Sequence, residues 1–183
     1  MKSSDKTLYV TIFSFGVFLY LLLGLMAGRA GYGPLTFMFG ILTIYGFFNT
    51  RKLWSIAKVI NSHPEMQNAK YKHEWDGSAI AVNDANRTVF LANGFKIKTY
   101  SFSDVRSWRY NLETGGKWIG GALFERWFRN AEVSAKNVAR SGFFVTVRDV
   151  ENPEWRIGFR MNDQTESQLK KWMEIMQQEI NEG

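Results

Sequence analysis

The first fifty residues restrict the fold of this 183-residue chain more than any other part, because they are almost without charge. Between Lys6 and Arg51 the one charged residue is Arg29, which separates two apolar stretches at residues 7–28 and 30–50. A helix rises about 1.5 Å per residue, so roughly 20 residues cross the hydrocarbon core of a bilayer. The sequence therefore predicts a membrane hairpin of two transmembrane helices, at about residues 8–27 and 34–50.

A cleaved secretory signal is the competing interpretation of the first stretch. Lys2 and Lys6 precede it, and Gly28-Arg29-Ala30 resembles a cleavage site. However, the apolar core of about 20 residues exceeds the roughly 7–15 that are typical of such signals, and a second apolar stretch follows it. We therefore expect the first stretch to stay in the protein as a membrane helix.

The distribution of Lys and Arg predicts the orientation of this hairpin. Lys2 and Lys6 precede the first span, whereas Arg51, Lys52 and Lys58 follow the second. An excess of Lys and Arg marks the cytoplasmic side of a membrane protein. The pattern predicts a multi-pass protein with both termini in the cytoplasm.

The remainder of the chain has the composition of an ordinary soluble domain. From Arg51 onward it contains twenty Lys or Arg and sixteen Asp or Glu, without a dense basic stripe, which argues against a nucleic-acid partner. The absence of cysteine excludes disulfides, Cys-ligated zinc and thiol catalysis. The second helix is expected to continue as a stalk until His63-Pro64 ends it, so the predicted regions are 1–62 and 63–183.

Beyond residue 70 the apolar residues change from helical spacing to alternation, which is typical of strands. Seven strands are expected, at residues 71–75, 78–82, 88–91, 95–100, 105–112, 143–147 and 155–161. Asn93-Gly94 is the strongest hairpin signal in the chain. Residues 163–181 then carry one apolar stripe at helical spacing, which predicts a closing helix packed on the core: Leu169, Trp172, Met173, Met176 and Ile180.

Two segments carry a family resemblance. The stretches "DGSAIAVNDANRTVFLANGFKIKTYSFSDVRSWRY" and "NPEWRIGFRMNDQTESQLKKWMEIMQQ" resemble bacterial domains of the PH-like and GRAM-like families, including an element of the "dI/dV" kind at Phe102-Ser103-Asp104-Val105. The resemblance covers residues 71–113 and 142–181. It implies an α+β fold, a PH-like seven-stranded β-barrel or sandwich with one C-terminal helix, at a bacterial inner membrane. It does not imply phosphoinositide binding, because the first hairpin lacks a basic cluster.

Residues 114–141 interrupt this pattern, and a loop of such length is commonly functional or disordered. Aromatic and basic side chains that suit contact with a membrane or a partner alternate here: Lys117, Trp118, Phe124, Arg126, Trp127 and Arg129. Contact with anionic lipid headgroups, packing on the barrel or stalk, and docking of a protein are three interpretations of this insertion.

The sequence offers little for catalysis. Its two histidines, His63 and His73, are expected at the surface, and the zinc, calcium and nucleophile-elbow motifs are absent from the sequence. We therefore expect neither an enzyme nor a cofactor or metal site. A membrane-bound enzyme would require a polar pocket in the barrel that the sequence does not reveal.

These observations predict a membrane-anchored binding or scaffolding protein that presents its domain at the cytoplasmic face of the inner membrane. The expected partners are membrane lipid and another membrane protein or a second copy of this chain, with no nucleic acid. The alternative is an exclusion or immunity protein that blocks phage DNA uptake, plasmid transfer or a membrane-active toxin. Nothing in the sequence distinguishes these two.

Overall fold

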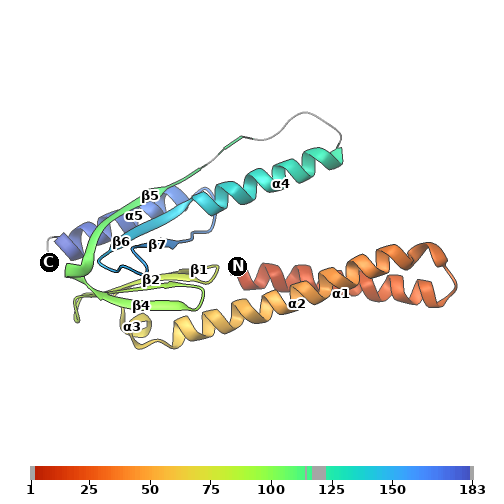
Figure 1. The fold of residues 1–183 in the computed structure, drawn as a ribbon, viewed down its shortest axis with the longest axis horizontal. Helices are drawn as coiled ribbons and strands as arrows, with labels where there is room; N and C mark the ends of the chain where they lie inside the picture. The colour runs from red at the N-terminus through yellow and green to blue at the C-terminus, as the bar shows by residue number, and fades with distance from the viewer. Residues whose placement is uncertain (1–2, 114, 117–122, 182–183) are drawn as a thin grey trace. The chain divides into compact units, whose positions relative to one another are not determined.

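The computed structural model describes residues 3–113, 115–116 and 123–181, and within residues 123–140 it describes the side chains from Arg129 onward. The chain divides into two units, Met1–Val59 and Ile60–Gly183, and each is described by itself. Figure 1 shows their elements along the chain.

Unit 1 is a pair of helices. Helix α1 (Ser3–Met26) leads through a short 3₁₀ turn (Ala30–Tyr32) into α2 (Gly33–Ser62). Glycines let the two helices approach closely: a Cβ atom on Gly40 would lie 3.2 Å from the ring of Phe18, and one on Gly46 would collide with Thr11. The facing sides of the two helices therefore leave little space for a larger residue at Gly40 or Gly46.

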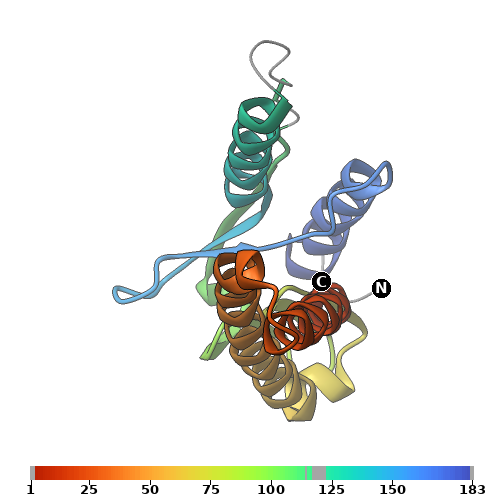
Figure 2. The same cartoon turned by 90° about the vertical axis from the view of Figure 1, so that its right-hand side faces the viewer.

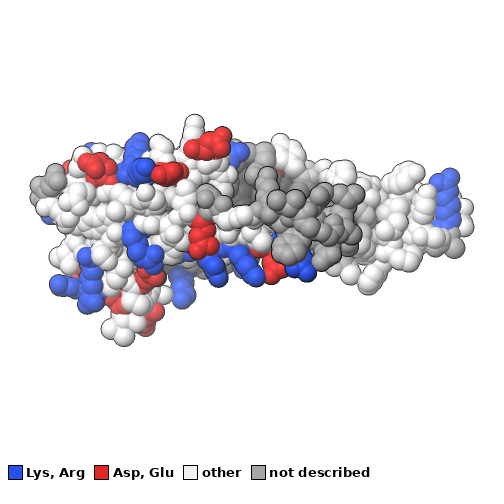
Figure 3. All heavy atoms as spheres, turned by 90° about the horizontal axis from the view of Figure 1, so that it is seen from above, with Lys and Arg blue, Asp and Glu red and all other residues white. Residues whose placement is uncertain are grey.

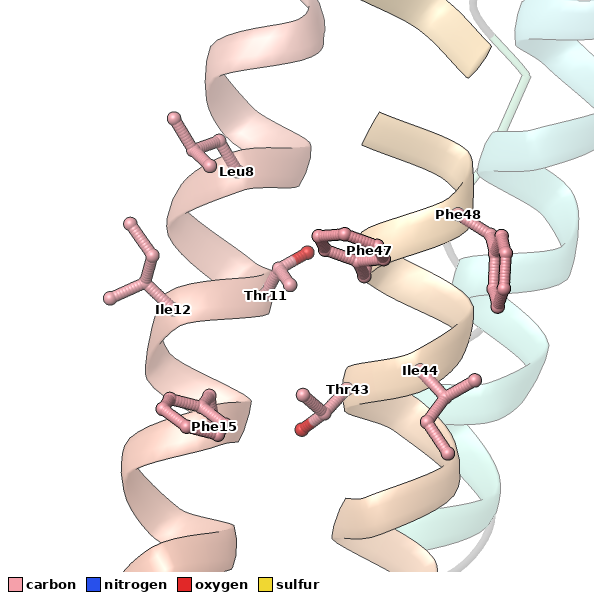
Figure 4. A pocket seen from close by; sticks show the side chains of 8 residues that line it. All are labelled: Leu8, Thr11, Ile12, Phe15, Thr43, Ile44, Phe47 and Phe48. Carbon is pink, nitrogen blue, oxygen red and sulfur yellow. The ribbon is translucent and has the colours of Figure 1, made fainter. Parts of the chain in front are cut away.

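The outer surface of unit 1 is apolar. Large side chains on both helices are exposed, among them Phe13 at 69%, Leu23 at 66% and Phe37 at 73%. An open apolar groove of about 440 Å³ runs between α1 and α2 (Figure 4), lined by Leu8, Thr11, Ile12, Phe15, Thr43, Ile44, Phe47 and Phe48. On the face shown in Figure 3, coloured charged side chains are sparse over unit 1 and frequent over unit 2. A contiguous apolar surface of this extent marks contact with a membrane or a partner.

The prediction of two transmembrane helices is wrong. Among the described helices, only α1 is long and apolar enough to cross a membrane, over Thr7–Met26 with a mean hydropathy of 2.2. The second predicted span, residues 34–50, includes two threonines, a tyrosine and a terminal Asn-Thr pair, which lower its hydropathy. It continues directly into Arg51 and Lys52 within the same helix. The multi-pass arrangement therefore has no support.

Unit 2 is an α+β domain with two antiparallel sheets (Figures 1 and 2). Its first sheet has the order β1-β2-β3-β4 and its second the order β5-β6-β7. The strands are β1 (Tyr71–Trp75), β2 (Ser78–Asn83), β3 (Thr88–Asn93), β4 (Lys96–Ser101), β5 (Val105–Asn111), β6 (Gly142–Val147) and β7 (Glu154–Ile157). The helices are α3 (Pro64–Asn68), α4 (Leu123–Arg140) and α5 (Thr165–Met176), followed by one π-helical turn (Gln177–Asn181); a 3₁₀ turn (Phe102–Asp104) joins the sheets.

The hairpins follow from local sequence. Asn93 pairs with Lys96, so the turn consists of Gly94 and Phe95, and Gly94 adopts a φ of 64° that glycine tolerates without strain. The first hairpin turns at Asp76 and Gly77, with φ values of 50° and 72°. Positive φ at both central residues is the geometry that matches the twist of antiparallel strands.

The core lies between the two sheets and α5. Its buried side chains come from alternating positions of both sheets, such as Ile80, Leu91, Phe143 and Ile157, and from α5. The predicted apolar stripe of the closing helix is confirmed: Leu169, Trp172 and Met176 are buried, and Met173 and Ile180 pack against the core. Full burial of one such side chain contributes about 1.5–3 kcal/mol.

The predicted seven strands are confirmed, but their closure into a PH-like barrel is wrong. No described strand of the first sheet pairs with a strand of the second, so the sheets stay separate. Side chains connect them instead: the indole Nε1 of Trp155 donates to the Tyr100 hydroxyl at 3.1 Å, and the Gly158 amide donates to Ser78 Oγ at 2.8 Å. Alternation specifies which face of a strand is buried, but not which edges pair.

Candidate functional site

The candidate site lies in the insertion at residues 114–141, whose described part is mainly helix α4. Lys117 and Trp118 lie outside the described residues. The backbones of Phe124, Arg126 and Trp127 belong to α4, but their side chains also lie outside the description. Arg129 is exposed on the same helix. Whether these six predicted contact residues act together stays a prediction.

The insertion was expected to be a long loop, whereas the structure contains an 18-residue helix. A sequence signal for it was available. Small or apolar residues occur at Ala131, Ser134, Ala135 and Val138, which is the i, i+3, i+4, i+7 spacing of one helix face. Of the positions between them, Glu132, Lys136 and Asn137 are polar and Val133 is apolar.

This small-residue face of α4 forms one wall of an open groove of about 600 Å³. The opposite wall comes from the β1–β2 turn and the ends of β3 and β7. Because the α4 wall consists of alanines, a serine and a valine, space remains between the helix and the sheets. The lining residues are Trp75, Asp76, Ser78, Asn93, Ala131, Ser134, Ala135, Val138, Ala139, Arg156, Gly158 and Phe159.

Arg156 fixes the C-terminal end of α4 in this groove. Its Nε and Nη2 atoms donate to the Ser141 carbonyl at 3.1 and 2.8 Å, and Nη2 also donates to the Val138 carbonyl in the last turn of α4. Burial lowers the pKa of Arg156, while the Asp76 carboxylate opposes this shift. A cation near the last carbonyls of a helix also complements the helix dipole.

Further hydrogen bonds hold the two ends of the insertion. The Asn111 amide donates to the Arg140 carbonyl at 3.0 Å, and the Glu113 backbone amide donates to Ser141 Oγ at 2.8 Å. Asn137 on α4 donates to the Gly115 carbonyl at 3.0 Å. These contacts tie the C-terminal end of α4 and the residue after it to the end of β5 and the residues that follow it.

Ser78 links the two parts of the sheet wall of the groove, the β1–β2 turn and the end of β7. Its hydroxyl donates to the Trp75 carbonyl at 2.8 Å and accepts from the Gly158 amide at 2.8 Å. A Cβ atom on Gly158 would lie 3.3 Å from this hydroxyl, so Ser78 would have to shift slightly to make room for a larger residue. The turn and the end of β7 are thus held in a fixed position beneath α4.

The lining chemistry suits binding. Trp75, Phe159 and the α4 face supply apolar surface, while Asp76 and Arg156 supply one negative and one positive charge. Among the described residues that line the groove there is no histidine, cysteine or lysine. A groove of this volume, apolar with a few polar groups, has the size and composition of a ligand or side-chain binding site.

Both histidines are half-buried, each with one part packed against the domain. His73 stacks on Phe159 with ring centroids 3.8 Å apart, and its Nε2 lies 3.0 Å from the Gly158 carbonyl. Burial lowers the pKa of His73. His63 accepts a hydrogen bond from the Glu65 amide at the start of α3. The described residues contain no His/Asp/Glu cluster suited to a metal ion.

A second polar cluster joins β4 to the β6–β7 loop. Asp149 accepts from Lys98 Nζ at 2.8 Å and from the Tyr100 hydroxyl at 2.6 Å. Both interactions hold the pKa of Asp149 well below its usual range. Desolvation, assisted by this carboxylate, raises the pKa of Tyr100 to about 12. Trp155 also donates to the Tyr100 hydroxyl, so hydrogen bonds link all four side chains of this cluster. We therefore interpret the cluster as a structural connection between the two sheets.

Comparison with known proteins gives a family for the folded domain. No curated protein and no solved structure matches the chain. A family model described as a domain of unknown function, DUF4755, matches residues 70–183, which comprise both sheets, α4 and α5. The chain therefore belongs to the DUF4755 family.

Proposed function

We propose that this protein is a membrane-anchored binding protein. Helix α1 holds it in a membrane, and the DUF4755 domain binds another membrane protein through the groove between α4 and the sheets. The membrane is the inner membrane of a bacterium, and its lipids surround the anchor.

The anchor is the observation that carries the proposal. Over Thr7–Met26 the helix has a mean hydropathy of 2.2 and contains no Asp, Glu, Lys or Arg, and only 11% of it is buried within the protein. Exposure of such a surface to water would be costly, at about 25 cal/mol per Å² of apolar area. Twenty helical residues match the hydrocarbon thickness of a bilayer.

The domain is proposed to lie on the cytoplasmic side. Arg51, Lys52 and Lys58 follow the apolar part of unit 1 and precede the domain. With Arg29, four basic residues follow α1 before the domain, whereas two lysines precede the apolar part of this helix. The side with more Lys and Arg is favoured for the cytoplasm. With α1 as the one proposed span, this orientation places the N-terminus on the opposite side of the membrane. Fusion of a reporter that is active only in the cytoplasm to the C-terminus tests this orientation, and an inactive reporter in a well-expressed fusion would contradict it.

Membrane fractionation tests the anchor. The intact chain is expected to stay in the membrane pellet after washing with alkaline carbonate. Leu19→Arg introduces a charge into the apolar helix at a cost of about 2.5–3.5 kcal/mol and should reduce the membrane fraction. Leu19→Phe is the matched control and should behave as the original chain. Release of the original chain by carbonate would refute the anchor.

Site-specific photo-crosslinking in intact membranes tests the groove. A photoreactive residue at Ser134, inside the groove, is expected to give a discrete adduct with a protein. The same residue at Lys170, which is exposed on α5 and outside the groove, is the control. Ala135→Trp fills the groove and should abolish the Ser134 adduct. Equal adducts from both positions, or adducts that persist with Ala135→Trp, would count against the groove as the binding surface.

A further inference from the structure

Strand β1 leaves one edge of the first sheet open. It is the terminal strand in the order β1-β2-β3-β4, and among the described strands only β2 pairs with it. An open groove of about 430 Å³ runs beside it, between β1 and α5, and is lined by Lys70, Tyr71, Lys72, His73, Gln168, Lys171, Trp172 and Ile175. A strand edge that is unpaired among the described strands is a template for pairing with another strand.

The register of the first hairpin shows which backbone groups face outward. Trp75 and Ser78 close the two-residue turn, so they form a hydrogen-bonded pair. Hydrogen-bonded and non-hydrogen-bonded pairs alternate along antiparallel strands. The pairs of Lys72 with Ala81 and of Glu74 with Ala79 are consequently non-hydrogen-bonded pairs. The amide and carbonyl groups of Lys72 and Glu74 point away from β2, toward the open edge.

The same two residues carry opposite charges on one face of the strand, because side chains alternate between faces. Lys72 is exposed and has no carboxylate within ion-pair distance among the described residues. Glu74 accepts from Asn61 Nδ2 at 2.9 Å through Oε2, which leaves Oε1 to accept a further bond. A carboxylate can accept hydrogen bonds through both oxygens.

These features make the edge complementary to itself. If a second copy of β1 is placed antiparallel with His73 opposite His73, each Lys72 faces Glu74 of the other copy, with their backbone groups in hydrogen-bonding position. A shift of the register by one pairing step puts Lys72 opposite Lys72, or Glu74 opposite Glu74, which is unfavourable. The centred register also sets Lys70 opposite Asp76, although Lys70 already forms an ion pair with Glu179 at 2.8 Å.

We propose that two copies of this protein associate through antiparallel pairing of β1, with reciprocal Lys72–Glu74 ion pairs, into one continuous sheet. The interface is two-fold symmetric, so each contact occurs twice. The ion-pairing residues Lys72 and Glu74 do not line the α4 groove, so failure of the dimer would leave the proposed binding function standing. An acidic segment of a different protein is the competing occupant, since lysines line the groove beside β1.

Disulfide cross-linking tests the register, because the chain has no cysteine of its own. Chains with Lys72→Cys and chains with Glu74→Cys, carrying different tags, are co-expressed and oxidised in the membrane. The mixed pair is expected to cross-link, since directly opposed residues have Cα atoms about 4.5–5.5 Å apart. Either variant alone should cross-link much less, because its two copies lie on a diagonal of about 7–8 Å. Absence of the mixed product would overturn the register.

Charge exchange tests the interface itself, on the full chain in detergent with the dimer fraction measured by light scattering. Lys72→Glu and Glu74→Lys should each raise the dissociation constant of the dimer by about tenfold or more, through like charges in opposition. The double variant Lys72→Glu/Glu74→Lys should restore dimerisation. Lys96→Glu, the same exchange on the opposite edge strand β4, is the control and should have no effect.

Three results would overturn the proposal. The original chain could run as a monomer at all concentrations, or the single variants could dimerise as well as the original. The double variant could also fail to recover dimerisation. If Lys72→Glu alone abolished association with a different protein while Glu74→Lys strengthened it, an acidic partner would be the occupant instead.

Discussion

Arg156→Ala should release the C-terminal turn of α4 without unfolding the domain. Arg156 is the side chain that donates to both the Val138 and Ser141 carbonyls, and its removal leaves these acceptors to water. Strand β7 keeps its backbone pairing with β6, because the pairing of Phe144 with Arg156 does not depend on the Arg156 side chain. The expected effect is therefore local, on the wall of the candidate groove.

The magnitude follows from the geometry. A hydrogen bond from a charged donor contributes about 1.5–3 kcal/mol when it is buried. Two of the three bonds share the Ser141 carbonyl and Arg156 is only half-buried, so we take a total of about 2 kcal/mol rather than the sum. Since about 1.4 kcal/mol corresponds to a factor of ten, local opening of the last turn should become about 30-fold more frequent.

Hydrogen–deuterium exchange with mass spectrometry measures this opening directly. Peptides covering residues 135–142 should lose protection by about this factor, whereas peptides from β2 and β3 should not change. Arg109→Ala is the matched control, because its exposed ion pair with Glu154 at 2.8 Å should contribute less than about 1 kcal/mol. Unchanged exchange at residues 135–142 in Arg156→Ala, or an equal change in Arg109→Ala, would refute this reasoning.

Three further predictions concern stability. The folded-state pKa of Asp149 is lowered, so its contribution is present at neutral pH and is lost as the pH falls below about 4; Asp149→Asn should flatten the acid limb of the thermal unfolding temperature. Burial lowers the pKa of His73, so folding should weaken as the pH falls below about 6.5, and His73→Gln should remove this dependence in denaturant titrations. Gly142 has a φ of 149°, and a Cβ atom there would lie 2.6 Å from the Ile157 carbonyl oxygen. Gly94 also has a positive φ, but open space surrounds it, so Gly94→Ala should lower the free energy of unfolding by about 1–2 kcal/mol. Gly142→Ala should lower it by more, and calorimetry of both variants measures the difference.

The strands of unit 2 were predictable because local signals specify them. The predicted strand at residues 71–75 agrees with β1, and Asn93-Gly94 lies at the β3–β4 turn as expected. The last strand is shorter than its alternation suggests. It ends at Ile157 because Gly158 bonds to Ser78 of the other sheet instead of continuing the ladder. Contacts between distant segments of this kind leave no local periodicity.

The errors have a common cause in long-range arrangement. Alternation in β4 and β5 does not reveal that the 3₁₀ turn at Phe102–Asp104 separates their sheets, so a barrel was expected where two sheets exist. The second apolar stretch is free of charge, but a lack of charge does not by itself give a helix the hydropathy of a membrane span. For the site, the spacing of Ala131, Ala135 and Val138 was available, but Arg156 and Phe159 join the groove only through the tertiary fold.

The short strand β7 is bonded to the other sheet at both of its ends. Trp155 reaches Tyr100 of β4, while Gly158, just past the strand, bonds to Ser78 and His73. Neither sheet can lose its order without breaking these cross-connections, even though no backbone ladder joins them. The domain should thus melt in a single transition, with equal calorimetric and van't Hoff enthalpies, and half-melted species with one intact sheet should not accumulate.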